Sequence, residues 1–324
     1  MPRLIGLLYG REETFPPALI HEINARRLKD VRAEAVRLGA VSAVESCPYR
    51  VIIDRISHAI PLYREYLRHA AVNSTTYVVN NPLWSDLDDR FLQLGLAQRL
   101  GISVPATLLL PSHSYPQEIT PEFLQNLEYP LPWEGILERV GLPAVLKSAR
   151  GWSREHKPVN SLRELLYHYN HSGQNLALLQ ARVPREAYVR CLGVGSSFHC
   201  RAFDPDSEVY LETDSLPRSI EEGVVEAAQK LTRALGYEVS VVEFAIQHGE
   251  PWLLDRAYPV PDFDWWSLSE PYFQQVVGSF ADLAIDRARS DEPTPSTVSF
   301  VASAGPAPES KRPATSRRRG DGSS

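Results

Sequence analysis

The chain has 324 residues and a mass of 36.4 kDa, with 43% hydrophobic and 23% charged residues, so its length suits two or three globular domains. Its net charge of −6 argues against general binding to nucleic acid, which depends on a basic surface. It contains no apolar stretch long enough for a secretory signal or a membrane span. We therefore expect a soluble, cytoplasmic protein without a membrane partner.

The first 80 residues alternate between strand-like and helix-like patterns. Strands are expected at residues 4–9, 31–38, 49–56 and 76–79, and helices from residue 15 and at residues 61–71. This order predicts a small, mostly parallel α/β sheet, a Rossmann-like domain over residues 1–85. No GxGxxG sequence follows the first strand, so a dinucleotide site of the usual kind is not expected.

The rest of the chain mixes helices with strands that pair in hairpins, which is typical of an α+β fold. Helices are expected at residues 86–100, 132–140, 162–169, 220–235 and 272–288, and strands at residues 104–111, 143–147, 176–183, 188–194 and 198–203. A last hairpin should pair residues 238–247 with residues 251–257 and turn at His248 and Gly249.

Residues 290–324 are rich in Pro, Ser, Ala and Gly and poor in large apolar residues. Such a segment buries too little surface to offset its ordering entropy, so we expect a disordered tail. Its basic cluster comprises Lys311, Arg312, Arg317, Arg318 and Arg319. The cluster could contact RNA or an acidic partner, but a solvated tail is the simpler interpretation.

The three cysteines are Cys47, Cys191 and Cys200, an odd number without the spacing of a zinc site or a disulfide framework. This usage favours a reducing compartment. Cys191 and Cys200 could face each other across adjacent strands. We interpret them as buried structural thiols.

Three features of the second half could carry chemistry. Lys147 ends an apolar strand beside a loop, where an ammonium can hold a phosphate, although an exposed lysine at a strand end is the simpler interpretation when the feature is taken alone. Glu243 and Asp255 lie on the two strands of the last hairpin, where one register brings both carboxylates to the same face. Such a pair either binds a divalent cation or finds basic partners, for which Arg190 and Arg256 are candidates. Arg190 itself lies within an apolar strand and could bind a phosphoryl group or form a salt bridge.

Taken in order, five stretches resemble the ATP-grasp superfamily, and most closely its ribosomal-protein glutamate ligases and related carboxylate–amine ligases. These stretches are NNPLWSDLDDRFLQLGLAQRLGISVPATLLLP, GLPAVLKSARG, LALLQARV, YVRCLGVG and VVEFAIQHGEPWLLDRAYPVP. The resemblance covers residues 1–285. It implies a Rossmann-like N-terminal domain followed by an ATP-grasp fold of two subdomains, at residues 86–175 and 176–289, that binds ATP and Mg²⁺.

The resemblance also implies roles for individual residues. Lys147 matches the lysine that holds the nucleotide phosphates, and Arg90 stands where the family usually has a lysine. Arg190 matches the catalytic arginine near the transferring phosphate, and Glu243 and Asp255 match two magnesium ligands. Glu186 matches a residue that reaches the ribose. The hinge whose backbone meets the adenine is matched by Gln180, Ala181, Arg182 and Val183.

The sequence departs from the family pattern at three places. Ala257 replaces the asparagine that serves as third metal ligand, and only Asp262 or Asp264 stands nearby as a substitute. The loop SARGWSREHKPV after Lys147 has a single glycine, Gly151, where the family has several. Arg90 keeps the charge of the usual lysine but not its shape.

These features lead to one main hypothesis and two alternatives. The main hypothesis is an ATP- and Mg²⁺-dependent ligase that joins a carboxylate to an amine or a thiol through an acylphosphate, with a small-molecule or peptide substrate. The departures favour a second hypothesis, a nucleotide-binding module without turnover. The third is an interaction protein that works through the basic tail. The sequence leaves a homo-oligomer open.

Overall fold

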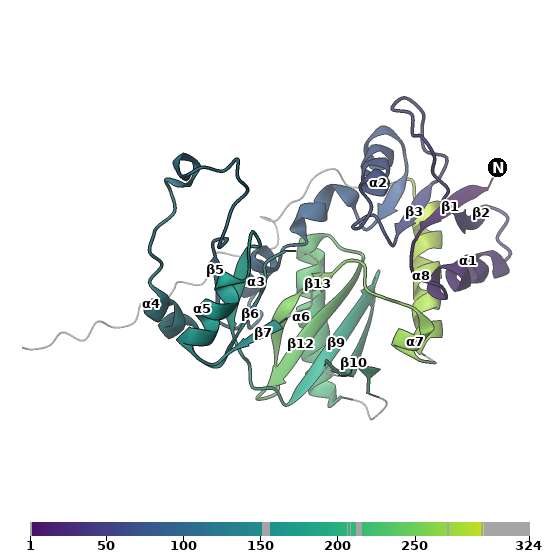
Figure 1. The fold of residues 1–324 in the computed structure, drawn as a ribbon. Coiled ribbons are helices and arrows are strands. Elements are labelled where there is room, and N and C mark those ends of the chain that lie inside the picture. The colour runs from purple at the N-terminus through teal and green to yellow at the C-terminus, as the bar shows by residue number, and fades with distance from the viewer. Residues whose placement is uncertain are drawn as a thin grey trace, which may run out of the picture.

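The computed structural model describes residues 2–150, 156–205, 207, 209–211, 216–270, 272–292 and 294, with the side chains of residues 85–87 left out. The described chain forms a parallel sheet and two antiparallel sheets (Figure 1). This architecture confirms the predicted fold class. None of the described helices is long and apolar enough to cross a membrane.

The first sheet is parallel, with strand order β2-β1-β3-β4. Its strands are β1 (Arg3–Leu8), β2 (Val31–Ala35), β3 (Val51–Asp54) and β4 (Tyr77–Val79). The helices α1 (Phe15–Ala25) and α2 (Pro61–Asn73) connect them and cover opposite faces, because successive apolar side chains of a strand point to opposite sides. Leu7 packs toward α1, and Leu8 packs toward α2.

The closing helix α8 (Tyr272–Arg289) returns to this first sheet and packs beside α1 (Figure 1). Its apolar residues also meet Leu192 and Val241 of the largest sheet, so one hydrophobic core joins the two layers. The chain then continues along β4, where the Thr294 hydroxyl accepts from the Val78 amide at 2.9 Å and donates to the Thr76 carbonyl at 3.0 Å.

The prediction of disorder from residue 290 is therefore wrong for residues 290–292 and 294, which the structure describes. The Thr294 hydroxyl is hydrogen-bonded to an edge strand, and composition carries no sign of such bonds. Residues 295–324, including the basic cluster, lie outside the described residues.

The second sheet is antiparallel, with strand order β5-β8-β6-β7. It contains β5 (Thr107–Leu110), β6 (Ala144–Ser148), β7 (His156–Val159) and β8 (Ala177–Ala181). The helices α4 (Trp133–Val140) and α5 (Leu162–Asn170) cover one face. The short β7 was not predicted, because it contains a proline and buries only Val159.

The third and largest sheet has the order β11-β10-β9-β12-β13. Its strands are β9 (Ala187–Val194), β10 (Ser197–Asp204), β11 (Val209–Tyr210), β12 (Val239–Gln247) and β13 (Glu250–Tyr258). The predicted turn between β12 and β13 is confirmed, with φ of 53° at His248 and 76° at Gly249. Positive φ at both positions suits a two-residue hairpin loop.

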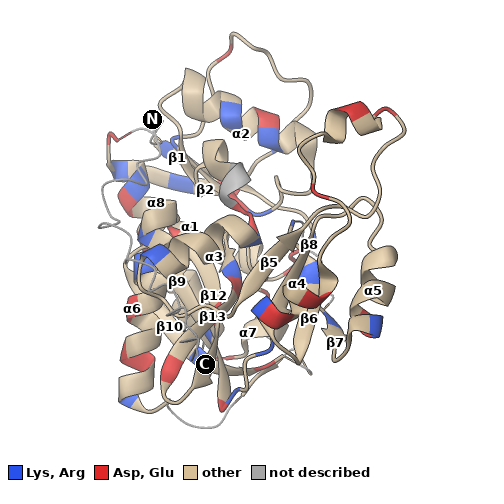
Figure 2. Ribbon diagram, turned by 90° about the vertical axis from the view of Figure 1, so that its left-hand side faces the viewer, with Lys and Arg blue, Asp and Glu red and all other residues tan. Residues whose placement is uncertain are grey.

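Two helices cover one face of the third sheet, α3 (Arg90–Arg99) and α6 (Arg218–Leu235). The charged residues of α6 are coloured in Figure 2, and its apolar residues pack on the sheet. The helix predicted at residues 86–100 begins at Arg90, because the Asp89 side chain accepts from the Leu92 amide and caps it. Shorter helical turns are η1 (Pro82–Leu87), η2 (Pro121–Leu124) and α7 (Trp265–Leu268).

Candidate functional site

Lys147 lies at the end of β6 and reaches from the second sheet to the third. Its Nζ donates to the Leu254 carbonyl of β13 at 2.7 Å and lies 4.0 Å from Asp255 Oδ1. Burial lowers the pKa of Lys147, and the charges of Asp255 and Glu243 oppose that shift. The lysine is thus a buried cation beside two acidic groups, which excludes the interpretation as an exposed strand end.

Asp255 lies in a β-bulge that displaces part of β13. Val242 pairs with Ala257 and Phe244 pairs with Leu253, so the single residue Glu243 faces residues 254–256. Such a bulge bends its strand and redirects the side chains in it. Sequence alternation alone cannot predict this register, although it correctly placed the two acids on one hairpin.

Three groups bind the Asp255 carboxylate. Arg90 donates from Nε to Oδ1 at 2.6 Å, Tyr258 donates its hydroxyl to Oδ2 at 2.5 Å, and Lys147 lies near Oδ1. Burial would raise the pKa of Asp255, but Lys147, Arg90 and Arg256 outweigh it and lower the pKa to about 2. Asp255 is therefore ionised at neutral pH, and its charge is shared among several cations.

Arg90 joins α3 to both antiparallel sheets. Besides the bond to Asp255, its Nη1 donates to the Ser148 carbonyl at 3.0 Å, and only 1% of the residue is exposed. A lysine has one donor group at the end of its chain, so it would make these two contacts less well. The Arg90 substitution thus suits a buried bridge between α3, β6 and β13.

Glu243 is paired with Arg190 on the neighbouring strand. The two residues are direct cross-strand partners, with Arg190 Nε 2.8 Å and Nη2 2.7 Å from Glu243 Oε1. Tyr188 donates its hydroxyl to Oε2 at 2.7 Å, and the Arg190 guanidinium lies 3.3 Å from the centre of the Phe203 ring. Glu243 therefore has a basic partner, which is one of the two alternatives raised by the sequence.

A second ion pair supports this cluster. Arg256, which is completely buried, has its Nε 2.5 Å from Asp88 Oδ1, and its guanidinium lies 4.7 Å from the centre of the Tyr258 ring. Burial raises the pKa of Asp88, although Arg256 and Arg90 oppose the shift. The sequence named Arg256 as a partner for an acid of the hairpin, but its direct partner is Asp88.

The residues that could hold a metal ion are Glu243 and Asp255. Among the described residues, no group of three or more His, Cys, Asp or Glu side chains has the geometry of a metal site. Magnesium is commonly bound through one or two carboxylates together with substrate phosphates. A metal at these two carboxylates would therefore need further oxygen ligands from outside the described residues.

Neither Asp262 nor Asp264 replaces the missing asparagine. Asp264 accepts from the backbone amides of Glu13, Thr14 and Phe15, at 2.8–3.1 Å, and so caps the first turn of α1. Asp262 accepts from the Asp264 amide and the Ser267 hydroxyl.

Ala257 itself faces the apolar core beneath the third sheet. It pairs with Val242, belongs to the core under α6 and is fully buried. Its amide donates to Gln93 Oε1 of α3 at 2.8 Å.

The predicted adenine hinge, residues 180–183, connects the second sheet to the third. The amides of Ala181 and Arg182 donate to the carbonyls of Ala106 and Pro143. The Gln180 side chain donates to the Thr107 hydroxyl at 3.0 Å. The amides of Ala181 and Arg182 are thus already bound within the protein.

Glu186, predicted at the ribose, directly precedes β9 and lies beside the turn between β12 and β13. Its carboxylate accepts from the His248 amide at 2.8 Å, and 57% of the side chain is exposed. The loop predicted to cover the phosphates, residues 151–155, lies outside the described residues.

Arg201 was missed by the sequence analysis. It is the cross-strand partner of Arg190, and its guanidinium lies 4.8 Å from the centre of the Tyr272 ring. Like charges directly opposite each other destabilise a sheet, unless an anion can lie between them. The spacing around the turn at Gly195 could have indicated this pairing.

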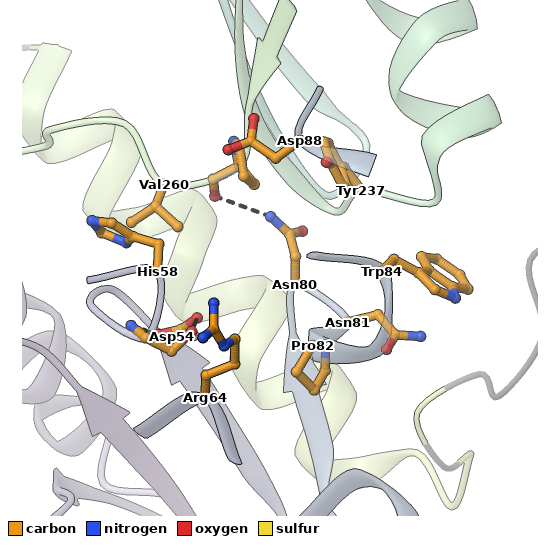
Figure 3. A pocket seen from close by; sticks show the side chains of 12 residues that line it. Asp54, His58, Arg64, Asn80, Asn81, Pro82, Trp84, Asp88, Tyr237 and Val260 are labelled. Carbon is orange, nitrogen blue, oxygen red and sulfur yellow. Dashed lines mark hydrogen bonds between the residues drawn. The ribbon is translucent and has the colours of Figure 1, made fainter. Parts of the chain in front are cut away.

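Two cavities lie at the carboxyl ends of β1, β3 and β4, where open α/β sheets usually bind ligands. One, of about 190 Å³, is lined by Asp54, His58, Asn80, Trp84 and Tyr237 among others (Figure 3). Asn80 Nδ2 donates to the Pro259 carbonyl at 3.0 Å, which fixes the chain that leaves β13.

The second cavity, of about 800 Å³, shares His58 and Val260 with the first and is lined by Tyr9, Arg11, Tyr63 and Trp266 among others. Both cavities adjoin the segment that follows Tyr258. The first cavity is also lined by Asp88, the partner of Arg256.

Comparisons with known proteins support the same architecture. No protein-family model matches the sequence, and no curated protein does. Solved structures do match. A RimK domain protein from Sphaerobacter thermophilus is 19% identical, with a TM-score of 0.62 over 86% of this chain and 98% of that one. The chain has the ATP-grasp fold.

Two further ATP-grasp structures align over a similar length. D-alanine–D-alanine ligase from Bacillus anthracis, complexed with ATP, is 14% identical, with a TM-score of 0.63 over 89% of this chain and 97% of that one. A RiPP-associated ATP-grasp ligase from Chryseobacterium gregarium, in complex with ADP and a leader and core peptide, is 13% identical, with a TM-score of 0.64 over 90% of this chain and 99% of that one. At these identities the likeness establishes the ATP-grasp fold alone.

Proposed function

We propose that this protein is an ATP-dependent ligase that joins a carboxylate to an amine or a thiol through an acylphosphate. The observation that carries the proposal is the cluster in which Arg90, Lys147 and Asp255 join the two antiparallel sheets, with Arg190 and Glu243 beside them. Its alternating charges suit a nucleotide triphosphate, whose phosphates need cations and whose metal needs carboxylates.

Lys147 and Arg90 hold the nucleotide phosphates in this proposal. Lys147 is a buried cation whose hydrogen bond to the Leu254 carbonyl is easily exchanged for a phosphate oxygen, a charged acceptor that forms the stronger bond. Residues 180–183 and Glu186 lie on the segment that connects the two sheets and would contact the base and the ribose.

Glu243 and Asp255 would hold Mg²⁺ together with the phosphates. When bound, the metal would neutralise charge on the phosphoryl group that is transferred. Arg190, which is paired with Glu243, would turn its remaining donors to that group. Arg201, opposite Arg190, adds a second guanidinium to this anion site.

The reaction needs no covalent nucleophile from the protein. A carboxylate oxygen of the substrate attacks the γ-phosphorus, and the bond to ADP breaks. The amine or thiol then attacks the acyl carbon, and inorganic phosphate leaves with the acyl oxygen. The protein contributes positioning and the stabilisation of spread negative charge.

The cavity of about 800 Å³ is the proposed place for the acceptor substrate. This volume suits a ligand larger than one small amino acid, and a peptide segment fits it. Tyr9, Tyr63 and Trp266 would contact apolar side chains, and Arg11 would attract a carboxylate. The peptide complex of the Chryseobacterium gregarium ligase shows that a protein of this fold binds such substrates.

Trapping of the acylphosphate tests the proposal directly. The full chain is incubated with ATP, Mg²⁺, hydroxylamine and pools of amino acids, small carboxylic acids and peptides. We expect ADP release and hydroxamate formation with a carboxylate present, and neither with Lys147→Ala. ATP binding without ADP or hydroxamate from any pool would contradict ligase activity.

That negative result would favour the second candidate, a nucleotide-binding module without turnover. One observation supports it: the position of the third metal ligand is Ala257, whose side chain is buried in the core. The two hypotheses agree on nucleotide binding and differ only in turnover, so the trapping experiment separates them.

A further inference from the structure

Cys191 and Cys200 are direct partners on the adjacent antiparallel strands β9 and β10. These strands are joined by a two-residue loop, Gly195 and Ser196, with φ of 59° at Gly195, and the pair Val194–Ser197 closes the loop. The pair that closes such a loop is hydrogen-bonded, and bonded and non-bonded pairs then alternate along the ladder. Cys191 and Cys200 therefore fall at a non-hydrogen-bonded pair, where opposite side chains are closest.

The two thiols lie on the face of the sheet that α6 covers, opposite the face that carries Arg190 and Arg201. Cys191 is completely buried, Cys200 is half-buried, and both are free thiols. Burial raises the pKa of Cys191 well above its ordinary value, and the neighbouring Cys200 adds to the shift. The two thiols are thus neighbours on one face of the sheet, with solvent access through Cys200.

We propose that Cys191 and Cys200 form a reversible disulfide and are the redox modification site of this protein. A disulfide needs Cα atoms about 4.4–6.8 Å apart. A non-hydrogen-bonded pair of an antiparallel ladder has a Cα separation of about 4.5 Å, within that range. The bond can therefore form without a change of strand register.

The chemistry balances with a hydroperoxide as oxidant. The half-buried Cys200 attacks the peroxide O–O bond, becomes a sulfenic acid and releases water or an alcohol. The Cys191 sulfur then attacks the Cys200 sulfur, the S–S bond forms, and the hydroxyl leaves as water with the remaining thiol proton. The two cysteines lose two electrons to the peroxide, and a dithiol reductant reverses the step.

The disulfide would also affect the opposite face of the sheet, because the two faces share the backbone of β9 and β10. Arg190 precedes Cys191 and Arg201 follows Cys200, and these arginines form the next pair of the same ladder. A disulfide fixes the spacing of the two strands at that point, and with it the spacing of the two guanidinium groups. The disulfide itself depends on the cysteines alone and not on the proposed ligase activity.

Mass spectrometry of the native full-length chain tests the proposal. Trypsin cleaves after Arg190 and Arg201, so one peptide, residues 191–201, contains both cysteines and no other cleavage site. After brief exposure of the folded protein to hydrogen peroxide, we expect this peptide to lose about 2 Da and to regain them with dithiothreitol. Cys47→Ser should leave this change intact, whereas Cys191→Ser and Cys200→Ser should each abolish it.

A second measurement guards against variants that fold poorly. The wild-type protein should show a higher Tm after peroxide treatment, and dithiothreitol should reverse the rise, because the bond restricts the unfolded chain. An unchanged mass of the peptide in the folded protein would overturn the proposal. Stable overoxidation of Cys200, or a bond from either cysteine to Cys47, would do the same.

Discussion

Arg90 and Asp255 form an ion pair that is almost sealed from solvent, with 1% and 4% of their side chains exposed and 2.6 Å between Nε and Oδ1. The arginine belongs to α3 and the aspartate to the bulged part of β13, so the pair connects a helix to an edge strand of the third sheet. Removing one partner of such a pair leaves a buried charge with fewer counterions.

Arg90→Ala should therefore lower the free energy of unfolding by about 3 kcal/mol. The exposed ion pair of Arg218 with Glu222 offers a matched control, and Arg218→Ala should change the free energy by less than about 0.5 kcal/mol. Urea denaturation followed by circular dichroism measures both. Equal changes in the free energy of unfolding for the two substitutions would show that burial of the Arg90 pair does not add to stability.

The free energy of unfolding at acidic pH should depend on the ionisation of Asp255. Its pKa is about 2 in the folded protein against 3.8 ordinarily, so the unfolded chain binds its proton first as the pH falls. The stabilisation is complete above the ordinary value, amounts to about 2 kcal/mol, and is lost as the pH falls toward 2. Denaturant titrations at several pH values measure this loss, and Asp255→Asn should make the free energy of unfolding depend less steeply on pH across this range. A slope identical to that of the wild type would contradict the assignment.

Lys147→Ala should weaken ATP binding at least tenfold, or by about 1.4 kcal/mol, because it removes the buried ammonium assigned to the phosphates. Isothermal titration calorimetry with Mg²⁺ measures the affinity. Lys230→Ala is the control, since Lys230 lies on α6 in an exposed pair with Glu226 and should leave the affinity unchanged. Equal affinities of the wild type and Lys147→Ala would refute the role of the lysine.

Ala257→Asn should not restore a third metal ligand. The Ala257 side chain lies in the core with Val242 and Phe244. An asparagine side-chain amide there would lose its hydrogen bonds to water and gain none from these apolar neighbours. We expect a loss of about 1–3 kcal/mol in stability and no gain in the magnesium dependence of ATP binding. Tighter binding of Mg²⁺–ATP by this variant would mean that the new side chain reaches the carboxylates.

Gly236→Ala should be more harmful than Gly101→Ala, although both glycines follow a helix at positive φ. A Cβ at Gly236 would lie 1.9 Å from Cζ3 of Trp84, whereas a Cβ at Gly101 would meet nothing within 4 Å. We expect a loss of about 1 kcal/mol at Gly101 and roughly 2–4 kcal/mol at Gly236. Thermal unfolding measures both, and a change in tryptophan fluorescence should accompany only Gly236→Ala.

Local patterns in the sequence predicted most of the fold. The parallel sheet follows from short apolar runs that alternate with helices, and the last hairpin follows from the turn residues His248 and Gly249. What could not be predicted depends on contacts between distant segments. The return of α8 to the first sheet and the anchoring of Thr294 on β4 leave no local sign in the sequence.

The candidate site divides in the same way. Residue types and their order singled out Lys147, Glu243 and Asp255, and the structure brings them near one another. Their roles toward a nucleotide remain predictions. The partners that neutralise them could not be read from the sequence, because Tyr258 reaches Asp255 only through the bulge and Arg201 meets Arg190 only through the register of a ladder.

The position of α8 also has a consequence for biosynthesis. One apolar face of the first sheet is covered by α1 together with α8, which is the last helix of the described chain. A ribosome adds about 5–20 residues per second, so after β4 is made this face waits roughly 10–40 s for its final covering element. During that interval the nascent chain exposes an incomplete core, and a ribosome-bound chaperone would find its binding site there.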